Sequence, residues 1–151
     1  MRATQLCELN LTQASGMLVQ PYDSEEGTVF GHGDGVVEGE RLRGSAVWFN
    51  FAHRRSDATM QPHIRGVITT HDGAAILFEL QGRVRWVANP DGPLGDQLMR
   101  ATFETSDERY RWINEAFCVF EGKIRLPPPG VEGGPVRIGS AHVYLCANEL
   151  F

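Results

Sequence analysis

Apolar and polar residues alternate singly along much of this chain, which is the pattern of β-strands that turn one face to a core. The clearest example is residues 43–53, where successive side chains fall into two sets: Val47, Phe49, Phe51 and His53, and Ala46, Trp48, Asn50 and Ala52. The same pattern predicts further strands at residues 4–11, 16–20, 61–70, 74–81, 83–88, 98–104, 116–125 and 135–147. The chain is therefore expected to be built almost entirely of strands.

Short turn signals separate these strands. Asp72-Gly73 predicts a tight hairpin, because glycine accepts the positive φ that such a turn requires, and His71 and Asp72 are expected to be exposed turn residues. The glycine-rich residues 31–35 lack the spacing of a nucleotide-binding loop and are interpreted as a β-turn. Residues 107–114 follow a helix-capping sequence and predict the one short helix.

The length and composition fit a single domain over residues 1–151. The chain has 17 glycines and 8 prolines, which fall in clusters between the apolar runs, and no linker or repeat interrupts it. An antiparallel sheet of about nine to eleven strands leaves no exposed edges if it closes on itself. We therefore predict an all-β fold, an antiparallel closed β-barrel with one short helix.

Charge and composition exclude several classes of function. A net charge of -5 argues against a nucleic-acid partner, since binding to phosphates requires a dense basic face. The chain lacks an apolar run of membrane-spanning length and a secretory leader, so we expect no membrane partner and a cytoplasmic protein. The three cysteines are widely spaced and are interpreted as buried thiols. The histidines show no metal-ligand spacing, and we expect neither a metal nor a cofactor.

Candidate catalytic residues lie on the strand at residues 61–70. His63, Arg65 and Thr69 share one of its faces, and the hairpin that follows can place Glu79 beside Arg65 and His63. One interpretation is an internal ion pair that only fixes the register of the strands. The other is catalytic: Arg65 orients an anionic ligand, while His63 or Glu79 transfers a proton.

Candidate substrate-binding residues surround this row. Trp48, Tyr110 and Trp112 could form flat apolar walls, and Asn50 could supply an orienting amide. Thr69 shares the face of Arg65, and His142 lies two residues before Tyr144 on the C-terminal strand. All of these side chains have an alternative role as ordinary core or surface residues.

Several short motifs occur in an order that resembles a known bacterial family: Gly33-Asp34-Gly35 with Gly39, Leu42 and Gly44, then Arg65, then Asp72-Gly73-Ala74-Ala75-Ile76 with Gly82, then Phe103-Glu104-Thr105, then Tyr110-Arg111-Trp112-Ile113-Asn114. The chain resembles the family known as domain of unknown function 3237. This resemblance implies a small lipocalin-like, calycin-type β-barrel, often oligomeric, with a polar-lined cavity. The chain differs from the family pattern at His63, where an aspartate is usual.

Three functional hypotheses follow from these observations. The first is a cofactor-independent lyase or isomerase that catalyses elimination, hydration, isomerisation or cyclisation of an anionic or phenolic, partly apolar substrate inside the barrel. The second is a non-catalytic carrier that binds a hydrophobic metabolite in the lumen. The third is a structural module that forms homo-oligomers, which predicts a lumen filled with side chains.

Overall fold

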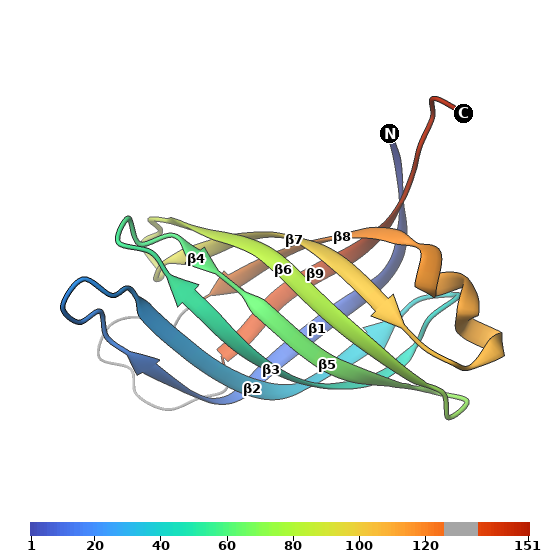
Figure 1. Cartoon of the computed structure of the whole chain (residues 1–151), viewed down its shortest axis with the longest axis horizontal. Coiled ribbons are helices and arrows are strands. Elements are labelled where there is room, and N and C mark those ends of the chain that lie inside the picture. Colours follow the sequence, from blue (N-terminus) through green and yellow to red (C-terminus); the bar gives the residue numbers. More distant parts are fainter. Residues whose placement is uncertain (126–135) are drawn as a thin grey trace.

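Nine antiparallel strands within the described part of the chain form one sheet that curls into a ring (Figure 1). The computed structural model describes residues 1–125 and 136–151, and the side chains of these residues except 136–139. The elements are β1 (Arg2–Val19), β2 (Gly27–Glu38), β3 (Gly44–Arg54), β4 (Met60–Gln61), β5 (His63–Thr70), β6 (Ala75–Val87), β7 (Leu94–Glu104), η1 (Glu108–Glu115), β8 (Phe117–Arg125) and β9 (Val136–Ala147).

The strand pairings close the ring. β1 pairs with β2 on one side and with β9 on the other, and the pairings of β2 with β3 and of β5 with β6 complete the circuit. The predicted antiparallel β-barrel is therefore confirmed. The strand number is at the low end of the prediction because residues 4–11 and 16–20 belong to one strand, β1, which has a bulge between Gln13 and Ser15. Residues 74–81 and 83–88 likewise merge into β6.

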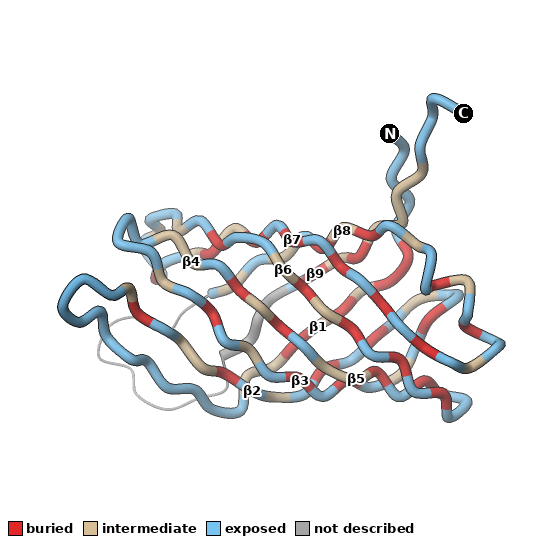
Figure 2. The backbone as a smooth tube through the Cα atoms, viewed as in Figure 1, coloured by how far each residue is buried: buried red, intermediate tan, exposed pale blue. Residues whose placement is uncertain are grey.

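Alternation along the strands separates an apolar interior from a solvated outer wall (Figure 2). The interior is formed by fully buried side chains from all sides of the ring, among them Leu9, Leu11, Ile64, Ile68, Ile76, Leu80 and Phe120. Each strand thus has one inner and one outer set of residues. This parity decides which of the predicted site residues can reach the lumen.

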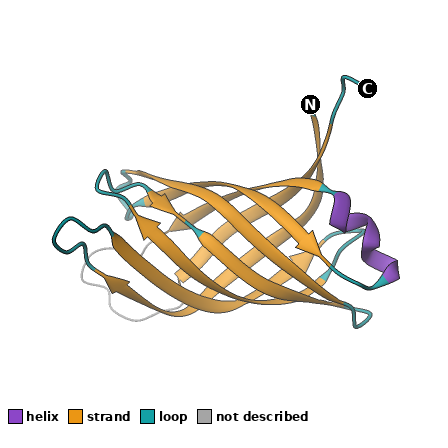
Figure 3. Ribbon diagram, viewed as in Figure 1, coloured by secondary structure: helices purple, strands orange, loops and turns teal. Residues whose placement is uncertain are grey.

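One end of the barrel is closed by η1 (Figure 3). This 3₁₀ helix is one residue displaced from the predicted helix at 107–114, and it buries Tyr110 and Ile113. Asn114 fixes its end, because its Oδ1 accepts from Thr105 N at 2.9 Å and its Nδ2 donates to Thr105 O at 2.8 Å. No helix in the described ranges is long and apolar enough to span a membrane.

The β5–β6 turn is bonded to this closed end through Asp72. Gly73 has a φ of 88°, as the hairpin prediction requires. The Asp72 carboxylate accepts hydrogen bonds from Thr70 Oγ1 at 2.6 Å and Tyr110 OH at 2.8 Å, and Arg109 forms an ion pair with it at 3.1 Å. These contacts, the Thr70 hydroxyl first, lower the pKa of Asp72 to about 2. Asp72 is thus more than a turn residue, because it joins the hairpin to η1.

Candidate functional site

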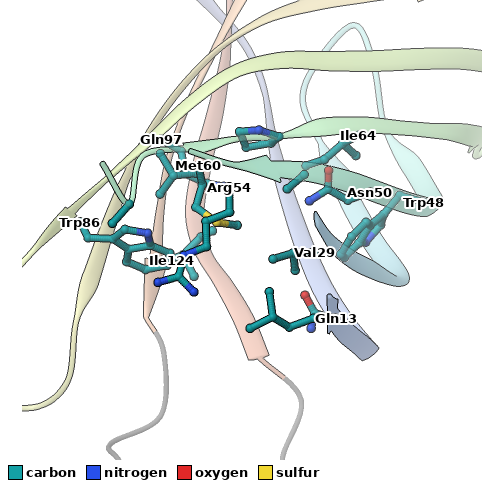
Figure 4. A pocket seen from close by; sticks show the side chains of 15 residues that line it. Gln13, Val29, Trp48, Asn50, Arg54, Met60, Ile64, Trp86, Gln97 and Ile124 are labelled. Carbon is teal, nitrogen blue, oxygen red and sulfur yellow. The ribbon is translucent and has the colours of Figure 1, made fainter. Parts of the chain in front are cut away.

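The barrel holds a cavity of about 370 Å³ (Figure 4). Its lining includes Met60 of β4, at the end of the barrel opposite η1 (Figure 1). Its walls come from eight strands, β1 to β8, and from the β3–β4 turn. The lining is mostly apolar: Leu18, Val29, Ala52, Ala58, Met60, Pro62, Ile64, Val84 and Ile124, with Gln13, Trp48, Asn50, Arg54, Trp86 and Gln97. The described residues therefore do not fill the lumen, whereas the structural-module hypothesis requires a lumen packed solid with side chains.

The glycine-rich residues 31–35 help to form this cavity instead of making a turn. They lie within β2, and Gly31, Gly33 and Gly35 occupy its inner face. A Cβ atom on Gly31 would lie 3.0 Å from Gln13 Oε1, so glycine there leaves room for the Gln13 side chain that lines the cavity. The interpretation of these residues as a β-turn was wrong, since a strand beside a crowded neighbour needs small residues as much as a turn does.

Two indole rings lie on opposite sides of the cavity. Trp48 comes from β3 and Trp86 from β6, and Figure 4 shows them facing each other across the open space. The Trp48 ring is only 4% exposed and is fixed by its Nε1, which donates to Asp34 O at 2.8 Å. Such walls suit a flat apolar molecule.

Asn50 and Arg54 bring polar groups to this apolar space. Both share the inner face of β3 with Trp48, two and six residues further along the strand. Asn50 Oδ1 accepts from His63 N at 2.9 Å, which leaves its Nδ2 as the free end of the amide. Arg54 is half-buried, and in the described part of the chain it is the one charged side chain that lines the cavity.

Gln97 on β7 is the most deeply buried polar residue of the lining. Its side chain is 2% exposed, and its Oε1 has no hydrogen-bond partner among the described residues. A polar group that is buried without a hydrogen-bond partner loses its hydration and gains no hydrogen bond that compensates for the loss. Such an atom is rare in a folded protein. At the inner end of the cavity, this unpaired oxygen lowers the free energy of unfolding of the protein.

The predicted catalytic row forms, but it forms on the outer wall. Arg65 Nε donates to Glu79 Oε2 at 3.1 Å, and His63 Nε2 lies 3.4 Å from Glu79 Oε1 and 3.1 Å from Arg65 Nε. The side chains of His63, Arg65 and Glu79 are 34%, 58% and 29% exposed. The row therefore lies outside the lumen, because Ile64 and Ile68 on the opposite face of β5 are the residues that enter the core.

Two residues of this row border a hollow of about 400 Å³ on the outer wall, and His63 lies beside them without lining it. Arg65 and Glu79 line the hollow together with Phe49, Leu77 and Glu104. Phe49 and Leu77 are exposed, although apolar side chains of this size are usually covered. The outer wall thus has a second place where a partly apolar molecule could lie beside ionisable groups.

The remaining predicted site residues are dispersed. Trp48 and Asn50 line the cavity, whereas Thr69 faces outward from β5. Tyr110 and Trp112 belong to the closed end, and His142 lies on the outer wall near Glu8 and Glu121. Trp112 packs instead under Arg41, whose Cζ is 3.7 Å from the ring centre.

Sequence reasoning missed Arg54, Trp86 and Gln97, although a signal for each was present. Arg54 has the parity of Trp48 and Asn50, and Trp86 and Gln97 have the parity of buried residues on their own strands. In the described residues no group of three or more histidine, cysteine, aspartate or glutamate side chains has the geometry to hold a metal ion.

A comparison with protein families matches residues 6–133 to the family described as a protein of unknown function, DUF3237. The chain belongs to the DUF3237 family. The family resemblance seen in the sequence motifs is thereby confirmed. No curated protein matches the chain.

Solved structures with the same fold come from several organisms. A β-barrel-like protein from Acinetobacter baumannii is 17% identical, with 95% of this chain and 94% of that chain covered and a TM-score of 0.77. A protein of unknown function from Clostridium acetobutylicum is 20% identical, with 95% and 97% covered and a TM-score of 0.77. An enzyme from Penicillium herquei is 20% identical, with 95% and 92% covered and a TM-score of 0.68. At these identities the likeness establishes the fold.

Proposed function

We propose that the barrel binds a small, partly apolar molecule, anionic or phenolic, in the cavity at its open end. The observation that carries this proposal is the cavity of about 370 Å³, whose two facing indoles and few polar groups match the usual make-up of a ligand site. Its volume lies within the range of about 300–1,000 Å³ typical of such sites. Within the described residues the cavity is only partly enclosed, so a ligand can enter it without unfolding the barrel.

Binding without reaction is the better supported form of this proposal. The described side chains that line the cavity include no histidine, carboxylate, lysine, thiol or phenol, so an ordinary acid or base for proton transfer is missing from them. The amides and the Arg54 guanidinium can orient a ligand and stabilise charge. A carrier needs only these interactions.

A cofactor-independent lyase or isomerase is the second candidate, and its site would be the outer hollow. There Arg65 would orient the anionic or phenolic substrate, while His63 or Glu79 would transfer the proton. The short contacts among these residues support this role, as does the fact that a protein of the same fold from Penicillium herquei is an enzyme. Such a site would use neither metal nor cofactor.

Titration with the fluorescent apolar probe N-phenylnaphthylamine tests the binding proposal. We expect saturable probe fluorescence and quenching of Trp48 and Trp86 in the wild type. Binding should be lost in Ala52→Phe, because Ala52 is fully buried and lines the cavity, so a benzyl group there would fill it. Ile124→Trp at the half-buried rim is a second occluding variant, and Phe51→Ala on the outer wall is the matched control.

The circular dichroism and melting of each variant establish that it is folded. Absence of saturable binding to the wild type would refute the proposal, as would undiminished binding to both folded occluding variants. To separate the two candidates, a panel of phenolic acids and ketones is incubated with the protein, recovered and analysed by mass spectrometry and NMR. Unchanged compounds support a carrier, whereas conversion that His63→Gln and Glu79→Gln abolish supports the enzyme.

A further inference from the structure

We infer that the cavity selects organic anions with a flat apolar body and a second hydrogen-bond acceptor, and that Arg54 sets this preference. This inference rests on the proposed binding function. It adds the charge of the ligand, the orientation of the ligand and the residue that recognises this charge. Three features of the open end carry it: the ion pairing around Arg54, the fixed amide of Asn50, and the apolar surface between them.

Two described carboxylates on segments next to Arg54 are already bound to other partners: Glu26, whose neighbour Gly27 pairs with Arg54, and Asp57, three residues after Arg54. Glu26 forms an ion pair with His53 and accepts from Ser56 N at 3.0 Å. Asp57 pairs with Arg55 at 3.3 Å and accepts from Thr59 N at 2.9 Å. Neither carboxylate is left for the guanidinium that lines the cavity.

Arg54 therefore differs from its neighbour Arg55. Arg55 is exposed and has a carboxylate partner, whereas Arg54 is half-buried against an apolar lining and forms no ion pair with any described residue. A guanidinium in such surroundings gains most from an anion that binds it through two parallel hydrogen bonds. The ligand is the missing partner in this arrangement.

Asn50 supplies the second point of recognition. Its Oδ1 is taken by the backbone N–H of His63, so the amide cannot turn over without losing that bond, and Nδ2 remains as a donor on the cavity side. The two residues are four positions apart on one strand, a separation of roughly 13 Å between their backbones. Ala52, between them, adds only a methyl group to the wall.

This arrangement defines the ligand. Both points offer donors, so the ligand presents an acidic group such as a carboxylate, sulfonate or enolate at Arg54 and a carbonyl, ether or hydroxyl oxygen at Asn50. Its middle is apolar and flat, because Trp48 and Trp86 face each other across the cavity. Small inorganic anions would leave the apolar walls uncovered, and amines would meet a positive charge.

Two related probes test the inference. Anilinonaphthalene sulfonate and N-phenylnaphthylamine share one aromatic framework and differ by the negatively charged sulfonate group. We expect wild-type protein to bind the sulfonate more tightly than the neutral probe. Arg54→Gln should weaken sulfonate binding about tenfold, the loss expected for a hydrogen bond to a charged group, and leave the neutral probe unaffected. Arg54→Lys should restore part of the loss, and Arg55→Gln is the matched control.

The outcomes distinguish failure of the proposed binding function from failure of the charge preference assigned to Arg54. If neither probe binds the wild type, the proposed function itself fails. If both bind but Arg54→Gln leaves their ratio unchanged, binding stands and the inference is overturned. Equal loss of both probes in a folded Arg54→Gln protein also overturns it, because Arg54 would then shape the cavity without reading charge. If Arg55→Gln selectively weakened binding of the sulfonate probe, the preference for anions would come from Arg55 and not from Arg54, and the inference would also be overturned.

Discussion

Replacing Gln97 by methionine should make the protein more stable, although Gln97 lines the proposed binding cavity. Gln97 lies opposite Val84 on β6 and Gly122 on β8, and a Cβ atom on Gly122 would lie 2.9 Å from its Oε1. That oxygen is buried and has no hydrogen-bond partner among the described residues. Methionine has nearly the same length and shape and brings no acceptor that needs a partner.

The size of the effect follows from the cost of the orphaned oxygen. A buried acceptor without a partner costs about 1–3 kcal/mol, so Gln97→Met should raise the free energy of unfolding by about 1–2 kcal/mol. For a domain of this length each kcal/mol corresponds to about 2–4 °C, which gives a melting temperature higher by about 2–8 °C. Gln97→Ala should act in the opposite direction, since it leaves a hole in the wall.

Urea unfolding followed by circular dichroism measures the free energy directly, and a thermal melt provides an independent reading. Gln97→Leu is a second apolar replacement that guards against a poor fit of methionine. If both apolar variants are no more stable than the wild type, Oε1 has a partner in solution and the reasoning fails.

Three further predictions concern the closed end and the buried thiols. Ile113→Ala should lower the free energy of unfolding by about 2–5 kcal/mol and Ile113→Val by about 1 kcal/mol, because Ile113 is fully buried in η1. Urea titration measures both changes. A loss below about 1 kcal/mol for the alanine variant would contradict the packing. The pKa of Asp72 is lowered from 3.8 to about 2, so its ionised form stabilises the fold above pH 3.8 and this contribution is lost as the pH falls toward 2. Over that range the melting temperature of Asp72→Asn should therefore fall less steeply than that of the wild type. Parallel plots of melting temperature against pH for the two proteins would refute the role of the carboxylate. Burial raises the pKa of Cys7 to about 12 and that of Cys118 to about 11, so a disulfide reagent at pH 8 should label both only after unfolding, and rapid labelling of either in the native protein would contradict their burial.

The fold was accessible from the sequence because alternation and turn residues act locally. Asp72-Gly73 requires a tight turn whatever surrounds it, and the register that follows from it correctly placed Glu79 opposite Arg65. The helix near residues 107–114 also followed from a local signal, its capping sequence. Closure of the ring followed from a property of the whole sheet, because a closed sheet has no exposed edges. Strand number was less certain, because a bulge inside β1 resembles a break between two strands.

The site was harder to predict because alternation assigns residues to two faces without saying which face is inside. On β5 the choice should have followed the cost of burial: Ile64 and Ile68 gain from the core, whereas Arg65 would need a buried partner. The role of Asp72 depended on Arg109 and Tyr110, which are far along the chain and reach it only through the packing of η1. Such contacts have no signature in a single sequence.

The two ends of the barrel offer a division of labour that protein engineering could exploit. The end that η1 covers holds the hydrogen-bonded lock between Asp72, Arg109 and Tyr110, while the opposite end holds the cavity and its rim. Because these regions share no residue, the turn between β3 and β4 and the turn between β6 and β7 can be randomised in a library while the lock keeps the scaffold folded. The barrel would then serve as a receptor whose specificity is rewritten at one end only.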